Sequence, residues 1–517
     1  MLNRFYKKIF LLTILLSSPS ISYGRTTLTR NDYYPLYTTM DPQSFLLRRT
    51  KNILQNREID NGRKRDNFCF YLTPFGQNAN VGRDFDNHDF PNCSCTDCGS
   101  SNSDPGESHL GSLNARWSMI GLLMGDIPKH KSYGTNLQEA REKIFGTSYT
   151  PTGTNPLCDS TAIDCLKKFG FFQFPGCYKK RGMRFHISGA ITDDFGIIVE
   201  GGFSAINLNI CMGCDNNLTG AITEGSCLEQ AQNTYGAENF NEININKYLM
   251  CRLPEIAQEL NRNLCDYHKN SFEDVRAGVY WRHPFQVNED RDSSWPQFLF
   301  IPFCSLGFTL PSGKEFCPMA PFSLPFGNNG HSAFWVYGGT NIDFTETIEI
   351  GWELGFTHFF DNSFTDYPMP TTSLQRGIFP FTADVTVSPG MNWHFSLKMD
   401  AYHFLDRLSF YFQWVIMEHK KDCFYVHGEN SCSCSADCGT CRTACTLGCE
   451  TCSNGQGQVF KPDVLSCRSA WKAQVINTAL NYDISPNVTL GFAWQAPISQ
   501  RNVFRSTTVA FGVNLTF

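Results

Sequence analysis

Residue types that could carry out hydrolytic chemistry lie close together at His186, Ser188 and Glu200. His186 and Ser188 are two residues apart in the segment "RFHISGA", and Glu200 follows a polar turn at 192–194. If that turn joins two antiparallel strands, His186 and Glu200 lie near each other across a hairpin. A histidine base beside a hydroxyl nucleophile, oriented by a carboxylate, is the arrangement that activates the nucleophile of serine hydrolases. These three residues are therefore a candidate catalytic triad.

This spacing resembles that of outer-membrane lipid A deacylases, whose triad is a His-x-Ser pair and a later glutamate. The resemblance implies that His186, Ser188 and Glu200 hydrolyse a lipid. Two features disagree. The lipid-facing residues of this hairpin are apolar, Phe185 and Ile187 among them, so the trio faces inward. The connecting turn is also assigned to the periplasm, whereas lipid A lies in the outer leaflet. We therefore predict no enzymatic activity and keep a lipid hydrolase as a minor alternative.

Cysteine is the second residue type with chemistry to offer. The chain has 23 cysteines, all after residue 24, which indicates disulfides in an oxidising compartment. The segment "CSCSADCGTCRTACTLGCETC" contains two CxxC pairs, Cys438/Cys441 and Cys449/Cys452, with only seven residues between them. Zinc ribbons usually separate such pairs by about 15–20 residues. Disulfides are thus favoured over zinc or an iron–sulfur cluster, which stay open as alternatives, and we predict no metal or other cofactor.

The cysteines predicted to form disulfides are grouped in three loop segments. They are Cys93, Cys95, Cys98, Cys211, Cys214, Cys432, Cys434, Cys438, Cys441, Cys445, Cys449 and Cys452. Because the total of 23 is odd, at least one thiol is free or is bonded to another molecule. A disulfide-linked neighbour in the cell envelope, or a second copy of the chain, is therefore an expected partner. The alternative is a buried free thiol at Cys69 or Cys304.

The N-terminus predicts export from the cytoplasm. Arg4, Lys7 and Lys8 precede the apolar run 9–16, and small residues follow as far as Gly24. This is the pattern of a secretory signal peptide, residues 1–24, which is removed from the mature protein.

The rest of the composition limits the partners. Residues 25–66 are predicted to be a periplasmic extension, since strand-like alternation begins only after them. The formal net charge is −6, which does not indicate a nucleic-acid partner. No apolar run after the signal reaches the 18 residues typical of a membrane-spanning helix. The remaining possibilities are a disulfide-rich soluble β-protein and a membrane β-barrel.

Hydrophobic residues at every second position predict an all-β fold with about twelve strands. In one such segment Ile348, Ile350, Trp352, Leu354 and Phe356 alternate with residues that include Glu349 and Glu353. The strands are expected at 67–77, 182–191, 195–208, 272–285, 297–308, 331–344, 347–359, 391–403, 408–419, 469–483, 488–497 and 506–517.

The connections between these strands alternate between short and long. Short connections join the strands of each hairpin, whereas mostly long segments join one hairpin to the next. Segment 498–505 is the exception, because it is short. The predicted long loops lie at 78–181, 209–271, 309–330, 360–390 and 420–468, and they are expected to contain short helices. Short periplasmic turns and long extracellular loops are typical of outer-membrane barrels. The sequence therefore predicts a transmembrane antiparallel β-barrel over residues 67–517.

The last strand supports the same interpretation. Apolar residues occupy every second position up to the end of the chain, at Val509, Phe511, Val513, Leu515 and Phe517. This pattern resembles bacterial outer-membrane β-barrel proteins, in which the terminal strand is also the signal read by the barrel-assembly machinery. The resemblance implies that these five residues form an assembly signal and that outer-membrane lipid surrounds the barrel. In its cysteine-rich composition the chain also resembles the major porins of chlamydia-like bacteria.

The polar face of the strands suggests a function. Charged and histidine side chains of both signs are predicted to face the barrel interior, where they would line a pore. They are Arg184, His186, Glu200, Asp274, Arg276, Arg282, Glu349, Glu353, His394, Lys398 and Asp400. We expect a porin-like channel for small hydrophilic solutes, with a disulfide-braced extracellular cap. The alternative is an adhesin or structural envelope protein that uses the barrel as an anchor. The sequence does not identify the solute.

Overall fold

The computed structural model describes most of the predicted strands. The described residues are 68–79, 82–83, 136–140, 176–192, 194–210, 245–283, 285–286, 298–344, 348–371, 379–405, 407–427, 452–453, 459–485, 487–501, 503–504 and 506–516. The predicted signal peptide and periplasmic extension lie outside them. No helix among these residues is long and apolar enough to cross a membrane.

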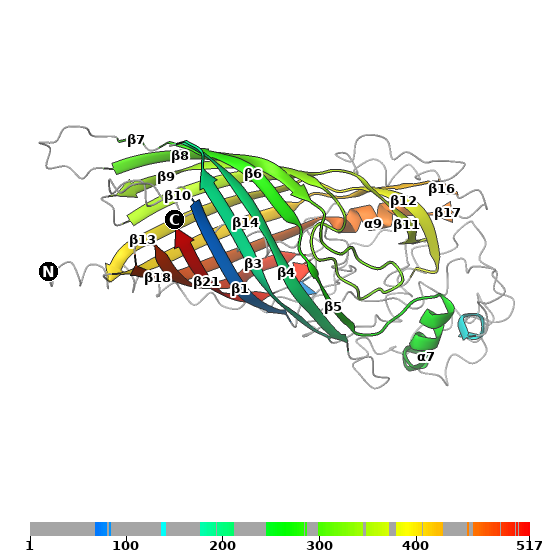
Figure 1. Ribbon diagram of the computed structural model, residues 1–517. Helices are drawn as coiled ribbons and strands as arrows, with labels where there is room; N and C mark the ends of the chain where they lie inside the picture. The colour runs from blue at the N-terminus through cyan, green and yellow to red at the C-terminus, as the bar shows by residue number, and fades with distance from the viewer. Residues whose placement is uncertain are drawn as a thin grey trace, which may run out of the picture.

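Twelve strands form one closed antiparallel barrel (Figure 1). They are β1 (Phe68–Ala79), β3 (Gly176–Ala190), β4 (Phe195–Ile210), β6 (Val275–Arg282), β8 (Phe298–Leu310), β9 (Ala333–Phe344), β10 (Ile348–Phe359), β13 (Asn392–Leu405), β14 (Leu408–His419), β18 (Trp471–Ser485), β19 (Val488–Arg501) and β21 (Thr507–Thr516). Each of the twelve predicted strands has its counterpart in this set, so the predicted fold class is confirmed.

The last strand closes the barrel, as predicted. β21 pairs with β19 on one side and with β1 on the other, where Leu72 lies opposite Val513. β1 in turn pairs with β3, and β3 with β4, so the ring is complete. Closure leaves no unpaired strand edge to face lipid, which a membrane barrel requires.

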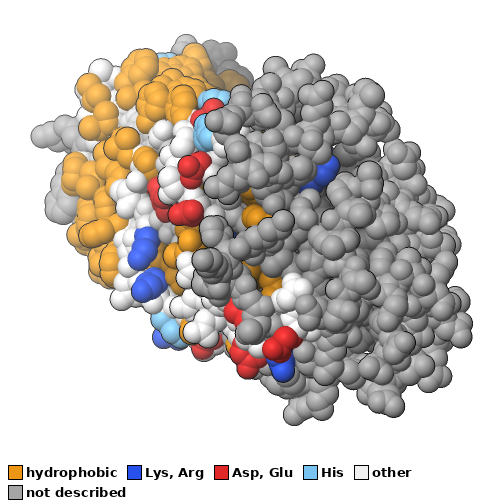
Figure 2. Space-filling view, turned by 90° about the vertical axis from the view of Figure 1, so that its right-hand side faces the viewer, with side chains coloured by type: hydrophobic (Ala, Val, Ile, Leu, Met, Phe, Trp, Pro, Cys, Tyr) orange, Lys and Arg blue, Asp and Glu red, His pale blue; other side chains and the backbone are white. Residues whose placement is uncertain are grey.

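The two faces of each barrel strand differ in polarity. On β10, Ile350, Trp352, Leu354 and Phe356 are 38–49% exposed, whereas Glu349 and the other alternate residues are buried. Exposed apolar side chains occur in the same way on the other barrel strands, and they form a hydrophobic surface bordered by charged residues (Figure 2). A barrel with an apolar exterior and a polar interior is the arrangement of transmembrane β-barrels.

The two ends of the barrel are unequal. Tight turns and the end of β21 lie at one end, which we call the turn end (Figure 1). Helices α7 (Ile245–Glu259) and α9 (Pro462–Ser469) lie at the opposite, loop end, with the short strand pair β16 (Cys452–Ser453) and β17 (Val459–Phe460). Three more short strands are present. β2 (Gly82–Arg83) pairs with β20 (Val503–Phe504), and β7 (Phe285–Gln286) pairs with β8. The sorting of long loops to one end follows the prediction.

A second sheet in the predicted loops was not expected. Strands β11 (Asn362–Met369), β12 (Phe381–Ser388) and β15 (Cys423–Val426) form a three-stranded antiparallel sheet separate from the barrel. The predicted loops 360–390 and 420–468 are therefore partly regular structure. The predicted loop boundary at 181 is also wrong, because β3 begins at Gly176 and pairs along its whole length with β4.

Candidate functional site: the inner wall of the barrel

The inner wall carries most of the residues predicted to face the interior. Ten of the eleven have buried side chains: Arg184, His186, Glu200, Asp274, Arg276, Glu349, Glu353, His394, Lys398 and Asp400. Arg282, near the turn end of β6, is only half-buried. The structure gathers these residues into separate groups with different partners.

A β-bulge brings two consecutive acidic residues to the interior. The first part of β4, up to Glu200, pairs with β6, and the part from Phe203 pairs with β5 (Tyr267–Phe272). The connection between β5 and β6 has one residue more than the facing part of β4 at Gly201–Gly202. A bulge breaks the strict alternation of side chains and can redirect one of them. Glu273 and Asp274 are therefore both buried, at 1% and 3% exposed. Strict alternation places Glu273 on the lipid face, which is why the sequence analysis missed it.

Glu273 binds two cations on the neighbouring strand β3. Its carboxylate lies 2.8 Å from Lys180 Nζ and 2.5 Å from Arg184 Nε, and it also accepts a hydrogen bond from Arg184 Nη2 at 2.8 Å. The Arg184 guanidinium lies 3.9 Å above the ring of Phe75. Buried charges need such pairing, because a charge taken out of water is costly unless it is neutralised and hydrogen-bonded.

The predicted contact between His186 and Glu200 is present. His186 Nδ1 lies 2.9 Å from Glu200 Oε1, and Arg276 Nη1 lies 3.8 Å from the other carboxylate oxygen. Arg276 also lies 4.7 Å from the ring of Trp335. Ser188 is buried on the same inner face as His186. All three residues of the candidate triad therefore face away from the lipid side of the hairpin, as the sequence analysis expected.

Asp274 has a role in holding a loop. Its carboxylate accepts hydrogen bonds from the backbone N–H of Gly313 at 2.9 Å and of Asn328 at 2.5 Å. Both donors belong to the segment 311–332 between β8 and β9. Tyr267 donates a further hydrogen bond to the Leu324 carbonyl oxygen at 3.0 Å. These bonds fix the segment 311–332 against the wall formed by β5 and β6.

Acidic residues lie side by side near the turn end. In the strand register Asp343 of β9 lies opposite Glu349 of β10, which lies opposite Asp400 of β13. Directly opposed positions in neighbouring strands have Cβ atoms about 5 Å apart. Glu353, four residues further along β10, lies 3.2 Å from His394 Nε2. The inner wall is thus more acidic at β9, β10 and β13 than at β3.

Uncharged amides occupy the neighbouring part of the inner wall, on β14, β18 and β19. Asn477 Nδ2 donates to Gln413 Oε1 at 3.1 Å, and Gln495 Nε2 donates to Asn477 Oδ1 at 2.8 Å. Thr508 donates to Gln495 Oε1 at 3.4 Å, which extends the chain of hydrogen bonds over four neighbouring strands. Lys398 lies opposite Gln413 in register and so continues this row on β13.

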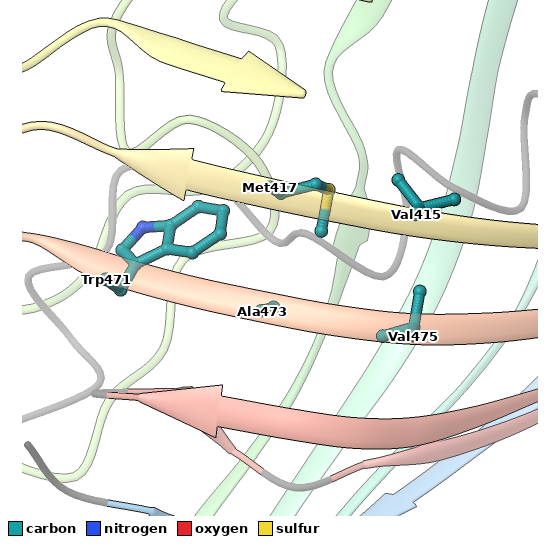
Figure 3. Packing of buried hydrophobic residues seen from close by; sticks show 5 residues of the cluster. All are labelled: Val415, Met417, Trp471, Ala473 and Val475. Atoms are coloured by element: carbon teal, nitrogen blue, oxygen red, sulfur yellow. The ribbon is translucent and has the colours of Figure 1, made fainter. Parts of the chain in front are cut away.

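Part of the inner wall is apolar. Val415 and Met417 of β14 pack with Trp471, Ala473 and Val475 of β18, and all five are at most 3% exposed (Figure 3). This cluster lies on the loop side of the Gln413–Asn477 hydrogen bond. The inner face of these two strands is therefore apolar in the loop-end half, whereas the turn-end half carries buried amides such as Gln413 and Asn477.

The segments at the loop end share an aromatic core. Phe316 of the segment 311–332 packs against Phe364 and Tyr367 of β11, with ring centroids 6.2 and 5.4 Å apart, and Tyr367 packs against Phe424 of β15. We call this assembly of the segment 311–332 and strands β11, β12 and β15 the cap. Its core joins three loops that are far apart in the sequence.

A buried histidine links two parts of the cap. His331 Nδ1 donates a hydrogen bond to the Phe360 carbonyl oxygen at 2.9 Å. Burial lowers the pKa of His331 below its ordinary value, although the Phe360 carbonyl and the carboxylates of Asp422 and Asp361 oppose that shift, and the nearby His419 adds to it. Because its pKa lies below the ordinary value, His331 is mainly neutral at pH 7.

The described cysteines test little of the predicted disulfide framework. Of the twelve candidates only Cys452 lies among the described residues, at the start of β16. Cys265, Cys304 and Cys317 are free and exposed, and Cys304 is on the outer face of β8. Cys69 is buried, and its thiol donates a hydrogen bond to Asn514 Oδ1 at 2.8 Å.

The residues of the predicted assembly signal lie on the outer face of β21. Phe511 is 58% and Val513 38% exposed, and Val509 and Leu515 are half-buried. Phe517 lies outside the described residues. The alternation predicted for this strand is present, whereas its reading by the assembly machinery stays a prediction.

Comparison with known proteins returned other barrels. An outer-membrane channel from Pseudomonas putida F1 superposes with a TM-score of 0.40 at 6% sequence identity, over 89% of this chain and 98% of that one. The translocator domain of the autotransporter NalP from Neisseria meningitidis gives 0.31 at 6% identity, over 93% and 99%. The NanC porin gives 0.27 at 9% identity, over 65% and 94%.

Sequence comparison gave no relatives. No protein-family profile matches the chain, and no curated protein matches it. In three dimensions the chain is similar to bacterial outer-membrane β-barrel proteins, the class that its terminal strand resembles.

Proposed function

We propose that this protein is a narrow outer-membrane channel for small hydrophilic solutes, with its loop end outside the cell. The observation that carries the proposal is the difference in polarity between the inner and outer faces of one closed barrel. Buried charged and amide side chains line the inner wall, whereas exposed apolar side chains cover the outer wall. Twelve strands enclose less space than the 16–18 strands that leave an open aqueous channel. The pore is therefore narrow, and the inner-wall charges select small solutes.

Conductance of refolded protein in a planar bilayer tests the channel. We expect ohmic steps of low conductance with weak ion preference, because neither sign of charge dominates the wall. Replacing Glu349 and Glu353 by glutamine is expected to shift the reversal potential toward anions, since both carboxylates belong to the acidic side of the wall. Gln413→Glu, in the amide row, is the matched control and should shift it toward cations. A barrel that is folded but silent would contradict the proposal.

A silent barrel would favour the second candidate, an adhesin or structural envelope protein. The observation for it is the cap, which has its own sheet and its own aromatic core. We propose that disulfides brace the cap and that Cys423, at the start of β15, takes part in one of them. Each intraloop bridge is expected to stabilise a segment with little apolar core by about 2–4 kcal/mol. Lipid, the barrel-assembly machinery and disulfide-linked neighbours are the partners of either candidate.

Surface labelling tests the orientation. A short epitope inserted at Ser485–Pro486, in the turn between β18 and β19, is expected to be inaccessible to antibody on intact cells. The same epitope near Gly455, between β16 and β17, is expected to be accessible. Permeabilised cells should expose both epitopes, which controls for their expression. The reverse pattern on intact cells would place the loop end in the periplasm.

Acid is expected to loosen the cap through His331. Its pKa is lowered in the folded protein, so the unfolded cap binds the proton more readily. The free energy of unfolding therefore falls as the pH drops below about 6.5, by at most about 1.4 kcal/mol per pH unit. Limited proteolysis at pH 7.5 and at pH 5 measures this loss of cap stability. His331→Gln should flatten the difference, whereas His427→Gln, at an exposed position of the cap, should not.

A further inference from the structure

A group of basic side chains lies on the outer face of the barrel at its loop end. Lys179 and Arg181 are exposed and alternate along β3 with the buried Lys180. Further along the same face, Met183 is 49% exposed and continues the apolar surface toward the turn end. β3 has 15 residues, more than the 9–11 that a tilted strand needs to cross the hydrocarbon layer. The first residues of β3 therefore project beyond that layer.

The neighbouring strands leave these cations accessible. Arg181 lies opposite Gly76 of β1 on one side and opposite Ala205 of β4 on the other. A Cβ atom added at Gly76 would meet nothing within 4 Å, so the space beside Arg181 is open. An anion can approach Arg181 from the β1 side without displacing a side chain.

A third basic residue extends the group onto β5. Asn207 of β4 lies opposite Lys179 on one side and opposite His268 on the other. His268 Nδ1 lies 3.2 Å from Asn207 Oδ1, and its Nε2 lies 3.9 Å from Asp266. We call Lys179, Arg181 and His268 the basic patch. No ion pair with another described residue involves Lys179 or Arg181, so the described part of the chain does not neutralise these two positive charges of the patch.

The opposite side of the loop end is organised differently. Lys472 of β18 is also exposed on the outer face, but it lies 3.3 Å from Glu418. Lys420 lies 3.0 Å from the other oxygen of the same carboxylate. These cations have an acidic partner, whereas among the described residues Lys179 and Arg181 of the basic patch have none.

We propose that the basic patch binds the phosphate group of an anionic lipid in the leaflet around the loop end. This inference rests on the proposed membrane orientation for the identity of that leaflet. Cations at the boundary of the apolar surface lie at the depth of lipid headgroups, and basic side chains near a membrane surface attract anionic lipids. The acyl chains of the same lipid contact the apolar face below, at Met183, Phe203 and Phe272, which are 46–65% exposed.

Lipid retention by the refolded full-length protein tests this proposal. Native mass spectrometry in neutral detergent compares phosphatidylglycerol with phosphatidylcholine as the added lipid. Wild type is expected to retain phosphatidylglycerol preferentially, and K179Q/R181Q to retain it roughly tenfold less. The charge-conserving K179R/R181K should restore retention, and the matched control K420Q/K472Q should retain as wild type does. A heat-dependent gel shift in each variant confirms that the barrel is folded.

Three results would overturn the proposal. Equal retention by wild type and K179Q/R181Q would remove the patch as the lipid site. Displacement of the lipid by inorganic phosphate at equal concentration would leave a site for free anions only. Equal retention of phosphatidylglycerol and phosphatidylcholine by wild type would rule out an anionic lipid, and the basic patch would then fit an acidic protein neighbour. The channel is tested separately, because K179Q/R181Q faces away from the interior and should leave conductance unchanged; a silent barrel that still selects phosphatidylglycerol would remove only the channel.

Discussion

Replacing Glu273 by glutamine is expected to lower the free energy of unfolding of the refolded barrel by about 3–5 kcal/mol. The side chain keeps its shape and loses its charge, so Lys180 and Arg184 remain buried without the carboxylate they share. Removing one member of a buried ion pair is costly because the charges that remain cannot regain their hydration. Urea unfolding followed by the heat-dependent gel shift gives the difference from wild type.

The matched control for this prediction is Glu418→Gln. Glu418 also binds two cations, but Lys420 and Lys472 are 56% and 50% exposed. Water compensates for the lost partner there, so the expected change is below about 1 kcal/mol. Glu273→Gln should also move the reversal potential toward anions, whereas Glu418→Gln, on the outer face, should not. A loss of stability for Glu273→Gln no larger than that of the control would show that Lys180 and Arg184 have other sufficient partners.

Glu273 also shows when the sequence is sufficient to predict which face of a strand a side chain occupies, and when it is not. The alternation at Ile350, Trp352 and Leu354 predicts both the strand and its lipid face, because the side-chain period of a strand is two. A single extra residue shifts that period, and nothing in the segment "NSFEDVRAG" marks the position at which the shift occurs. Alternation therefore does not identify Glu273, whereas it does select Asp274 and Arg276, which are also buried.

The hydrogen-bond partners of inner-wall residues could not be predicted from the sequence, for a related reason. Asn477 and Gln495 are recognisable as polar positions on two separate strands, but their hydrogen bond depends on the register between the strands. Register is set by turns and by the closure of the whole ring. The His186–Glu200 contact was predictable, because a tight turn fixes the register of that hairpin.

The cap sheet was missed because its strands have no clean period. Asp366, in the middle of β11, has φ = 53°, a left-handed conformation that aspartate tolerates better than most residues. The register between β11 and β12 shifts at this point. Alternation is lost on both sides of the irregularity, so a search for period-two segments finds only a loop.

Deleting residues 507–517 is expected to abolish the folded barrel. β21 pairs with β1 over eight positions and with β19 over eight more. Without β21, the facing edges of β1 and β19 meet lipid with unpaired N–H and C=O groups, each of which costs several kcal/mol in hydrocarbon. The sum exceeds the net stability of about 5–15 kcal/mol that folded proteins have. No heat-dependent gel shift should appear after refolding, and the chain should be fully digested by protease.

Two substitutions at Phe511 separate strand pairing from side-chain chemistry in the same strand. Phe511→Leu keeps the backbone pairing and an apolar side chain on the outer face, so it should fold as wild type does. Phe511→Arg keeps the pairing but places a charge on the lipid side, where it is expected to cost about 2–4 kcal/mol at mid-membrane depth.

If the chain truncated by residues 507–517 gave the wild-type gel shift, β1 and β19 would have paired directly to form a smaller barrel. Closure by β21 would then not be required for folding.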